Sequence, residues 1–207
     1  MNWVLEITSA VIISGCALGF TVGSFWYQNI RRGELRAFEP HTFGATVTTR
    51  LIRLRLPLVF YNDGARPIVV RGMRLHLAYD TTLITVPWNG GTKSRLMPEE
   101  GDHLDLPAAF PVEGRKALQV FAEFSITKSP PDVHPVEYTA HLEVMLDEPD
   151  HWIELLIFPL RAGNILEPSS FIAYGNAEDE ATIEERAAAK SAFERVLEAK
   201  SRTKSAE

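Results

Sequence analysis

The sequence predicts a mainly β protein that carries an apolar helix at its N-terminus and a charged helix at its C-terminus. Three observations support this prediction. Residues 7–27 contain no charged side chain, residues 43–162 contain several stretches in which apolar and polar side chains alternate, and residues 178–207 are dense in charge. A long uncharged run is typical of a membrane-spanning helix, and alternation is typical of strands with one buried face.

The N-terminal apolar run extends from Ile7 to Tyr27, a length of 21 residues. A helix of that length reaches about 31 Å, which matches the hydrocarbon core of a bilayer. Trp3 precedes the run and Trp26 closes it with Tyr27, at the levels where aromatic rings favour the headgroup layers. We therefore predict a transmembrane anchor at residues 1–28, with the run in contact with the lipid bilayer. A buried helix of a soluble domain is the alternative, but it normally shows a polar stripe.

Two kinds of processed segment are alternatives to a retained anchor. A secretory signal needs basic residues before its apolar run, and residues 1–6 contain none. The run Ile13-Ser14-Gly15-Cys16 resembles the lipobox of bacterial lipoproteins, and this resemblance implies acylation of Cys16. The resemblance covers four residues, lacks a preceding basic region, and is followed by further apolar residues as far as Trp26. We therefore expect the segment to be retained.

Three arginines directly after the run, Arg31, Arg32 and Arg36, are the predicted topology-determining residues. Lys and Arg near a span stay on the cytoplasmic side, whereas the N-terminal side offers only the chain's amine and the acidic Glu6. The sequence thus predicts a single-pass protein of the cell (plasma) membrane whose domain is cytoplasmic. An extracytoplasmic domain is the alternative, because long domains cross membranes largely regardless of charge.

Gly15, Gly19 and Gly23 recur at every fourth position of the span and share one face of a helix. In lipid, such a stripe lets a second helix approach closely and pack through van der Waals contacts. We expect these glycines to form a helix–helix packing surface, either with a second copy of the chain or with the span of a protein partner. Glycine is also common in membrane helices without such a role.

The chain beyond the span, about 180 residues, is long enough to form one domain whose core needs no metal or disulfide. Cys16 is the only cysteine, so no intramolecular disulfide forms, which fits a reducing compartment. The net charge of −6 argues against a general nucleic-acid-binding protein, which usually carries a basic surplus.

Residues 29–42, with Gly33 and Pro40 as breakers, are predicted to form a juxtamembrane tether. Alternation then begins, and it is clear in residues 54–60 and again in residues 68–79. The intervening residues 62–67, Asn-Asp-Gly-Ala-Arg-Pro, are typical of a turn, so we expect these two strands to form a hairpin.

Further strands are predicted at residues 83–88, 117–126, 136–146 and 152–160, separated by clusters of Gly, Pro, Asn and Asp. Many short strands with such turns favour an antiparallel immunoglobulin-like β-sandwich over residues 43–162. The Cys and Trp spacing of true immunoglobulin domains is absent, so the prediction concerns architecture alone. A closed barrel is the alternative.

Residues 163–177 have apolar side chains without a clear period and are predicted to be a surface-packed linker. In the charged helical tail, residues 178–207, Thr182 and Glu185 have the spacing of a capping box that begins a helix ending near Lys200. Its apolar content is too thin for a sustained coiled coil. We expect a solvent-exposed α-helix, with a docking peptide for a partner as the alternative.

No arrangement of residues indicates catalysis, and we predict no catalytic, cofactor-binding or metal-binding residue and no small-molecule substrate. The six histidines show no close pairing at the spacing of zinc ligands, and no nucleophile elbow is present. Residues 89–94 resemble a phosphate-binding loop only superficially, because the glycine that must precede the lysine is missing. The acidic loops at residues 99–102 and 147–150 lack the ligand spacing of a calcium loop.

In the predicted hairpin, Arg55 lies opposite Arg74 and Arg53 lies opposite His76. Like charges that face each other across strands destabilise a sheet, so we expect a partner to neutralise these arginines. A neighbouring strand that carries outward glutamates, such as Glu137 and Glu143, is one candidate. An anionic membrane surface or an acidic partner is the other, which makes Arg53, Arg55 and Arg74 candidate contacts with an anionic surface.

These observations predict a single-pass, membrane-anchored, non-catalytic β-sandwich module for protein–protein interaction or for scaffolding a membrane or envelope complex. The alternative is an accessory subunit of a transporter or membrane enzyme whose site is assembled from loop residues and is not visible in the sequence.

Overall fold

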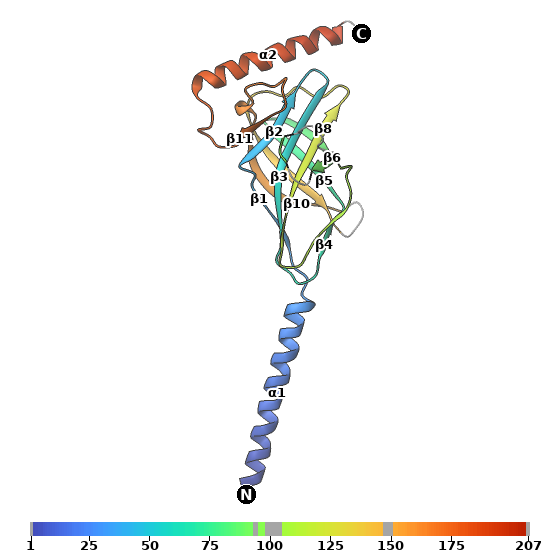
Figure 1. Ribbon diagram of the computed structural model, residues 1–207, viewed down its shortest axis with the longest axis vertical. Coiled ribbons are helices and arrows are strands. Elements are labelled where there is room, and N and C mark those ends of the chain that lie inside the picture. The colour runs from blue at the N-terminus through green and yellow to red at the C-terminus, as the bar shows by residue number, and fades with distance from the viewer. Residues whose placement is uncertain (1, 93–94, 98–104, 147–150, 206–207) are drawn as a thin grey trace.

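The computed structural model describes residues 2–92, 95–97, 105–146 and 151–205, with side chains described between residues 11 and 202 of those ranges (Figure 1). Strands account for 46% of the chain and helices for 23%, which confirms the mainly β prediction. The elements, in chain order, are α1 (Asn2–Asn29), β1 (Leu35–Phe38), β2 (Thr42–Val47), β3 (Leu51–Asn62), β4 (Ile68–Val70), β5 (Gly72–Tyr79), β6 (Thr82–Thr92), β7 (Phe110–Val112), β8 (Ala117–Thr127), β9 (Glu137–Met145), β10 (Trp152–Arg161), the 3-10 helix η1 (Ala162–Asn164), β11 (Ile172–Gly175) and α2 (Ile183–Ser205).

The N-terminal helix α1 projects away from the β domain and carries the N-terminus at the far end of the molecule (Figure 1). A helix that is apolar on all sides has no face that a soluble core would select. The helix ends where the amides of Ile30 and Arg31 both donate to the carbonyl of Trp26, at 2.9 and 3.0 Å. The predicted apolar N-terminal helix is therefore confirmed.

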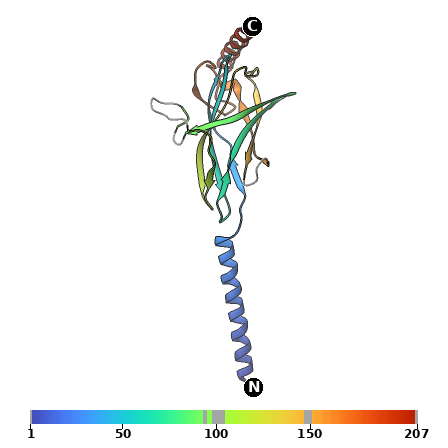
Figure 2. The same cartoon turned by 90° about the vertical axis from the view of Figure 1, so that its right-hand side faces the viewer.

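The strands form an antiparallel curled sheet in the order β10-β9-β5-β6-β8-β3-β2-β11, with β1 also paired to β3. β6 pairs with β5 through residues 82–87 and with β8 through residues 88–92. Between these two parts the register shifts at Asn89, whose side-chain amide donates to the carbonyl of Ser125 at 2.7 Å. Because a bulge bends its strand, β6 turns the sheet around the core (Figure 2).

The core contains the side chains that the alternation assigned to the inner face. In β9, Tyr138, Ala140, Leu142 and Val144 are at most 1% exposed, whereas the residues between them are half-buried or exposed. β3 has the same buried positions at its even-numbered leucines, although Arg55 between two of them is also buried. The prediction of which face is buried is therefore confirmed for both strands.

The predicted hairpin between residues 54–60 and 68–79 is wrong. β3 pairs with β8, β2 and β1, whereas β5 pairs with β6 and β9. The fully buried Asn62 accounts for the separation, because its side-chain amide donates to the carbonyls of Arg66 and Val112 at 2.7 and 3.0 Å. These bonds turn the chain out of the sheet into β4, which pairs with β7.

The predicted tether at residues 29–42 contains a strand. β1 pairs with the last four residues of β3, from Val59 to Asn62, and also contacts β10. Because β3 and β10 belong to opposite parts of the curled sheet, β1 lies between the two at the end of the domain nearest α1. The segment is thus part of the β domain.

The predicted surface linker at residues 163–177 also contains a strand, since β11 pairs with β2 from Ile172 to Gly175. The buried Asn176 follows it, and its side-chain amide donates to the carbonyls of Pro40 and Pro159 at 3.3 and 2.7 Å. These bonds join the C-terminal part of the chain to the β1–β2 connection and to β10.

The expectation that the C-terminal helix is solvent-exposed is wrong for one face of α2. Ala189 is fully buried and Phe193 is 1% exposed, and the helix packs on η1 at the end of the domain far from α1 (Figure 1). These residues are four apart, so even thin apolar content makes a continuous stripe. The predicted capping box is confirmed, because the Thr182 amide donates to the Glu185 carboxylate at 2.8 Å and the Glu185 amide donates to the Thr182 hydroxyl at 3.2 Å.

Candidate functional site

The apolar surface of α1 is bare. From Val11 to Asn29 the helix is long and apolar enough to cross a membrane, and none of that stretch is buried against the rest of the protein. Phe20 is 77% exposed and Ile13 is 67% exposed. Water-exposed apolar surface of this extent is unfavourable. The predicted packing glycines Gly15, Gly19 and Gly23 have no neighbouring side chain within 4 Å, so their stripe is open to a second helix.

Closely packed backbones join α1 to the β domain. Gly33 follows the helix and lies against Gly64 in the β3–β4 turn, so tightly that a Cβ on either residue would overlap the backbone of the other. The Ala65 amide donates to the Arg31 carbonyl at 2.9 Å, and the Glu34 amide donates to the Asp63 carboxylate at 2.7 Å. We call residues 29–36, 62–66 and 113–116 the basal junction. Its contacts fix the direction in which α1 leaves the domain.

Two of the predicted topology-determining arginines bind the domain itself. Arg31 and Arg36 both lie near the carboxylate of Asp63, at 3.5 and 3.7 Å. The guanidinium of Arg31 also lies over the ring of Tyr27, at 5.3 Å from its centroid. Arg115 lies over the same ring at 5.2 Å and donates to the Tyr27 carbonyl at 2.7 Å. Sequence reasoning missed Arg115, because no local pattern signals a contact across 88 positions.

The third arginine, Arg32, is exposed and lines a groove of about 760 Å³ at the basal junction. Arg66, from the β3–β4 turn, is also exposed and lines the same groove. The opposite wall comes from the end of β9 and the start of β10, where Leu146, Ile153 and Leu155 are apolar and the exposed Glu154 is acidic. This basal groove therefore combines guanidinium groups with an apolar surface.

The arginines predicted to contact an anionic surface have carboxylate partners within the sheet. Arg55 is 3% exposed and donates to Glu123 of β8 at 2.8 Å, and the same carboxylate lies 3.2 Å from Arg53. Arg74 donates to Glu143 of β9. The neutralising groups are thus on neighbouring strands. Of the two glutamates that the sequence suggested, Glu143 pairs with Arg74, whereas Glu137 pairs with Arg161 at 3.0 Å. Arg55 is too deeply buried to reach a membrane surface.

The outer face of the sheet holds two adjacent histidines, since His76 of β5 is opposite His141 of β9. His76 lies 2.8 Å from the Thr85 hydroxyl and 3.2 Å from the Glu143 carboxylate, and His141 lies 2.7 Å from Glu154. Burial opposes ionisation of Glu143, but hydrogen bonds from Arg74 and His76 outweigh it and lower the pKa of this carboxyl group.

A hydroxyl group next to an imidazole that in turn contacts a carboxylate is also the arrangement of hydrolase catalytic triads. Here Thr85 lies directly opposite His76, whereas Glu143 lies opposite Arg74, which binds its carboxylate, and is diagonal to His76. None of them lines a pocket described for this chain. Over residues 2–92, 95–97, 105–146 and 151–205, no three His, Cys, Asp or Glu side chains are grouped to hold a metal ion. Cross-strand pairing accounts for this arrangement.

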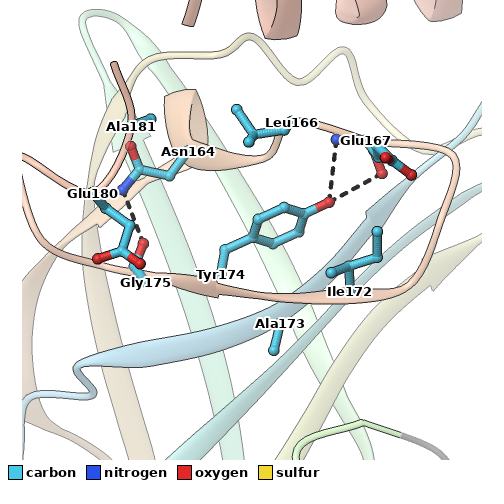
Figure 3. Close-up of a pocket in the computed structure, with 9 residues that line it drawn as sticks. All are labelled: Asn164, Leu166, Glu167, Ile172, Ala173, Tyr174, Gly175, Glu180 and Ala181. Carbon is cyan, nitrogen blue, oxygen red and sulfur yellow. Dashed lines mark hydrogen bonds between the residues drawn. The ribbon is translucent and has the colours of Figure 1, made fainter. Parts of the chain in front are cut away.

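A small pocket of about 290 Å³ lies beside β11, beneath the segment that leads to α2 (Figure 3). Its central side chain, Tyr174, accepts from the Glu167 amide at 3.2 Å and donates to the Glu167 carbonyl at 3.1 Å. Burial raises the pKa of the Tyr174 hydroxyl. Asn164 donates to the Gly175 carbonyl at 2.9 Å. Because these groups already bind one another, the pocket offers few free donors or acceptors to a ligand.

A larger groove of about 940 Å³ lies at the opposite end of the domain from α1. It is bounded by α2 and by the loops that follow β2 and β8, with Arg50 and Lys128 on its rim. Lys200 of α2 crosses it to reach Asp132 at 2.5 Å and the carbonyl of Pro130. These contacts hold the end of α2 against the domain.

Comparisons with known proteins provide no family for this chain. No protein-family model and no curated protein matches it. A crystal structure of a protein from Archaeoglobus fulgidus is similar at a TM-score of 0.33 and 10% sequence identity, over 71% of this chain and 98% of that chain. Similarity at this level supports no inference about function.

Proposed function

We propose that this protein is a single-pass membrane protein whose β domain is a non-catalytic module, held at the membrane surface to bind a protein partner or to scaffold a membrane complex. One observation carries the proposal. The apolar surface of α1 is bare from Val11 onward, and the helix leaves the domain at its base. A bilayer removes this surface from water without requiring any change in the domain.

The residues at the end of α1 support the same arrangement. Trp26 and Tyr27 are both 52% exposed, at the level where a span meets the headgroups. Arg31, Arg32 and Arg36 follow directly after the span. Because positive charge beside a span favours the cytoplasmic side, we propose that the domain is cytoplasmic and that the membrane is the plasma membrane.

The architecture of the domain supports a binding role. The curled antiparallel sheet has an inner face that forms the core and an outer face whose charges are paired between strands. We propose that it acts as a rigid sandwich-like module of the immunoglobulin-like kind, a type of scaffold that presents loops and faces to partners. The packed glycines of the basal junction would hold this module in one orientation above the membrane.

Membrane insertion is tested by alkaline carbonate extraction of the full chain expressed in cells. The wild-type chain should stay in the membrane pellet. A Leu18→Lys/Phe20→Lys variant should be extracted, because each lysine at the centre of a span costs about 3 kcal/mol of insertion free energy. The matched Leu18→Ala/Phe20→Ala variant should remain in the pellet. A wild-type chain that is released by carbonate, or that is soluble without detergent, would overturn the proposal.

Orientation is tested on sealed vesicles of known sidedness. Protease should digest the domain from the cytoplasmic face and leave it intact from the other face. The reverse pattern would retain the anchor but place the module outside the cytoplasm.

A further inference from the structure

We propose that the basal groove binds the headgroup of an anionic phospholipid from the adjacent leaflet, with Arg32 and Arg66 contacting its phosphate. This inference rests on the membrane anchorage proposed above and specifies the lipid that the module contacts. Four observations support it: the position of the groove, the charge around it, the ion pairs of the nearby basic residues, and the side chains that line the groove.

The groove lies close to the end of α1, at the level of the lipid headgroups. Arg32 lies three residues beyond the end of α1 at Asn29, and the aromatic residues Trp26 and Tyr27 lie just before that end. When α1 spans a bilayer, the groove is therefore at the level of lipid phosphates rather than in bulk water. A phospholipid can enter it from the side without leaving its leaflet.

Charge at the basal junction is opposite to that of the whole protein. Its residues include six cations and three anions, a local surplus of three positive charges in a chain whose net charge is −6. Basic residues close to an anionic leaflet are attracted to it, and this attraction acts within about 10 Å of the surface. The concentration of positive charge at the one end that faces the membrane favours an anionic lipid.

The pairing of these cations leaves two of them available. Asp63 lies beside Arg31 and Arg36, Glu113 binds Lys116, and Arg115 donates to a backbone carbonyl. Among the described residues, no ion pair is formed by Arg32 or Arg66, and both side chains are exposed. Planar guanidinium groups bind phosphate oxygens through two parallel hydrogen bonds, so two arginines suit a phosphate.

The lining of the groove suits the remainder of a lipid. Leu146, Ile153 and Leu155 line it opposite the arginines, Ile68 lies beside Arg66, and Ile153 is 38% exposed. A soluble phosphate compound would leave this apolar wall in water, whereas the start of an acyl chain would cover it. Glu34 and Glu154 also line the groove and would oppose an anion, although the Glu154 carboxylate lies 2.7 Å from His141. Removal of the Glu34 carboxylate should therefore strengthen the binding of an anionic lipid.

The test is native mass spectrometry of the full chain in detergent micelles, titrated separately with phosphatidylglycerol, phosphatidylcholine and phosphatidylethanolamine. Phosphatidylglycerol should bind most tightly, with one lipid retained per chain. An Arg32→Gln/Arg66→Gln variant should bind it about 30-fold more weakly, the factor expected from two lost contacts between a basic residue and an anionic surface. A Glu34→Gln variant should bind it several-fold more tightly.

The matched control is Arg50→Gln/Lys128→Gln. It removes two exposed positive charges from the rim of the groove beside α2, at the end of the domain opposite α1. Its affinity for phosphatidylglycerol should stay within twofold of the wild-type value. An equal loss in both double variants would show attraction by net charge alone and would overturn the assigned site. Tighter binding of phosphatidylethanolamine, or displacement of the lipid by millimolar inorganic phosphate, would also overturn it.

Failure of this inference is distinguishable from failure of the proposed function. A chain that inserts into phosphatidylcholine vesicles but shows no preference among headgroups would retain the anchor and refute the lipid site. A chain that fails to insert into any vesicle would refute both.

Discussion

Substitution of Gly64 by alanine should detach α1 from its fixed position on the β domain. The methyl group would overlap the backbone of Gly33, which cannot move aside as the end of a flexible side chain can. Relief of the overlap requires separation of the β3–β4 turn from the segment after α1. The strands themselves do not need to move, so the effect should be confined to the basal junction.

The size of the effect follows from the hydrogen bonds that separation breaks. Three hydrogen bonds join the β3–β4 turn to the segment after α1: Ala65 amide to Arg31 carbonyl at 2.9 Å, Glu34 amide to Asp63 carboxylate at 2.7 Å, and Asp63 amide to Glu34 carbonyl at 3.3 Å. Each contributes about 1 kcal/mol net, so the free energy of local opening should fall by about 3 kcal/mol. That change raises the population of the open junction about 100-fold.

Limited trypsin digestion of the full chain in mild detergent measures this opening, because trypsin cleaves after arginine and the junction contains Arg31 and Arg32. When opening and closing are fast relative to cleavage, the cleavage rate reports the open population. Release of the domain fragment that begins at Gly33 should be about 100-fold faster in the Gly64→Ala variant. Gly163→Ala is the matched control, since its methyl group would have ordinary van der Waals contact with Pro135 at 3.4 Å.

Equal cleavage rates in the wild-type and Gly64→Ala chains would refute the reasoning. The reasoning would also be refuted if trypsin cut the wild-type chain at Arg31 as rapidly as it cuts an unstructured peptide. Either result would favour the juxtamembrane tether that the sequence predicted over a packed junction.

Three further predictions concern the rest of the molecule. Phe193→Ala should undock α2, because loss of a buried phenylalanine costs about 3 kcal/mol or more of stability. Amide hydrogen exchange in α2 should then become about 100-fold faster. The control variant Glu194→Ala changes an exposed residue of α2 and should leave the exchange rate unchanged. The lowered pKa of Glu143 makes its ionised form stabilising above the ordinary pKa of a glutamate, and this stabilisation is lost as the pH falls through the lowered value. Thermal melting should therefore show a steeper loss of stability on acidification in the wild-type chain than in Glu143→Gln. Gly19→Ile should abolish dimerisation of α1 in a membrane reporter assay, and an unchanged signal would exclude the glycine stripe as the packing surface.

Local spacing was sufficient for several features of the fold. The uncharged run from Ile7 predicted α1, alternation predicted the buried face of β9, and the spacing of Thr182 and Glu185 predicted the start of α2. Each feature depends on residues within one or two turns of helix or one strand. Such residues meet whenever the element forms, so the sequence reports them directly.

Strand partners could not be obtained in the same way. Alternation shows that β3 and β5 each have a buried face, but it does not identify the strand beside either one. Asn62 contributes to the outcome, because its hydrogen bond to the carbonyl of Val112 forms only when β7 lies next to the turn. A residue that was interpreted as part of a simple hairpin turn instead directs the chain out of the sheet.

For the candidate site, too, the sequence predicted what is local, and the structure decided what depends on long-range contacts. The sequence singled out Arg31, Arg32 and Arg36 as a group with one role, since they are close together after the span. The structure separates them, because Asp63 lies beside Arg31 and Arg36 while Arg32 joins Arg66 in the basal groove. Nothing in the local sequence of Arg66 marks it as a neighbour of α1.

The sequence by itself determined that the chain has an apolar N-terminal helix, a mainly β domain and a capped C-terminal helix, because composition and periodicity are properties of short segments. Tertiary structure alone decided the order of the strands, the docking of α2 through Ala189 and Phe193, and the rigid basal junction. These features depend on contacts between residues far apart in the chain. Such contacts exist only after the core has formed, and their partners leave no periodic signal in the sequence.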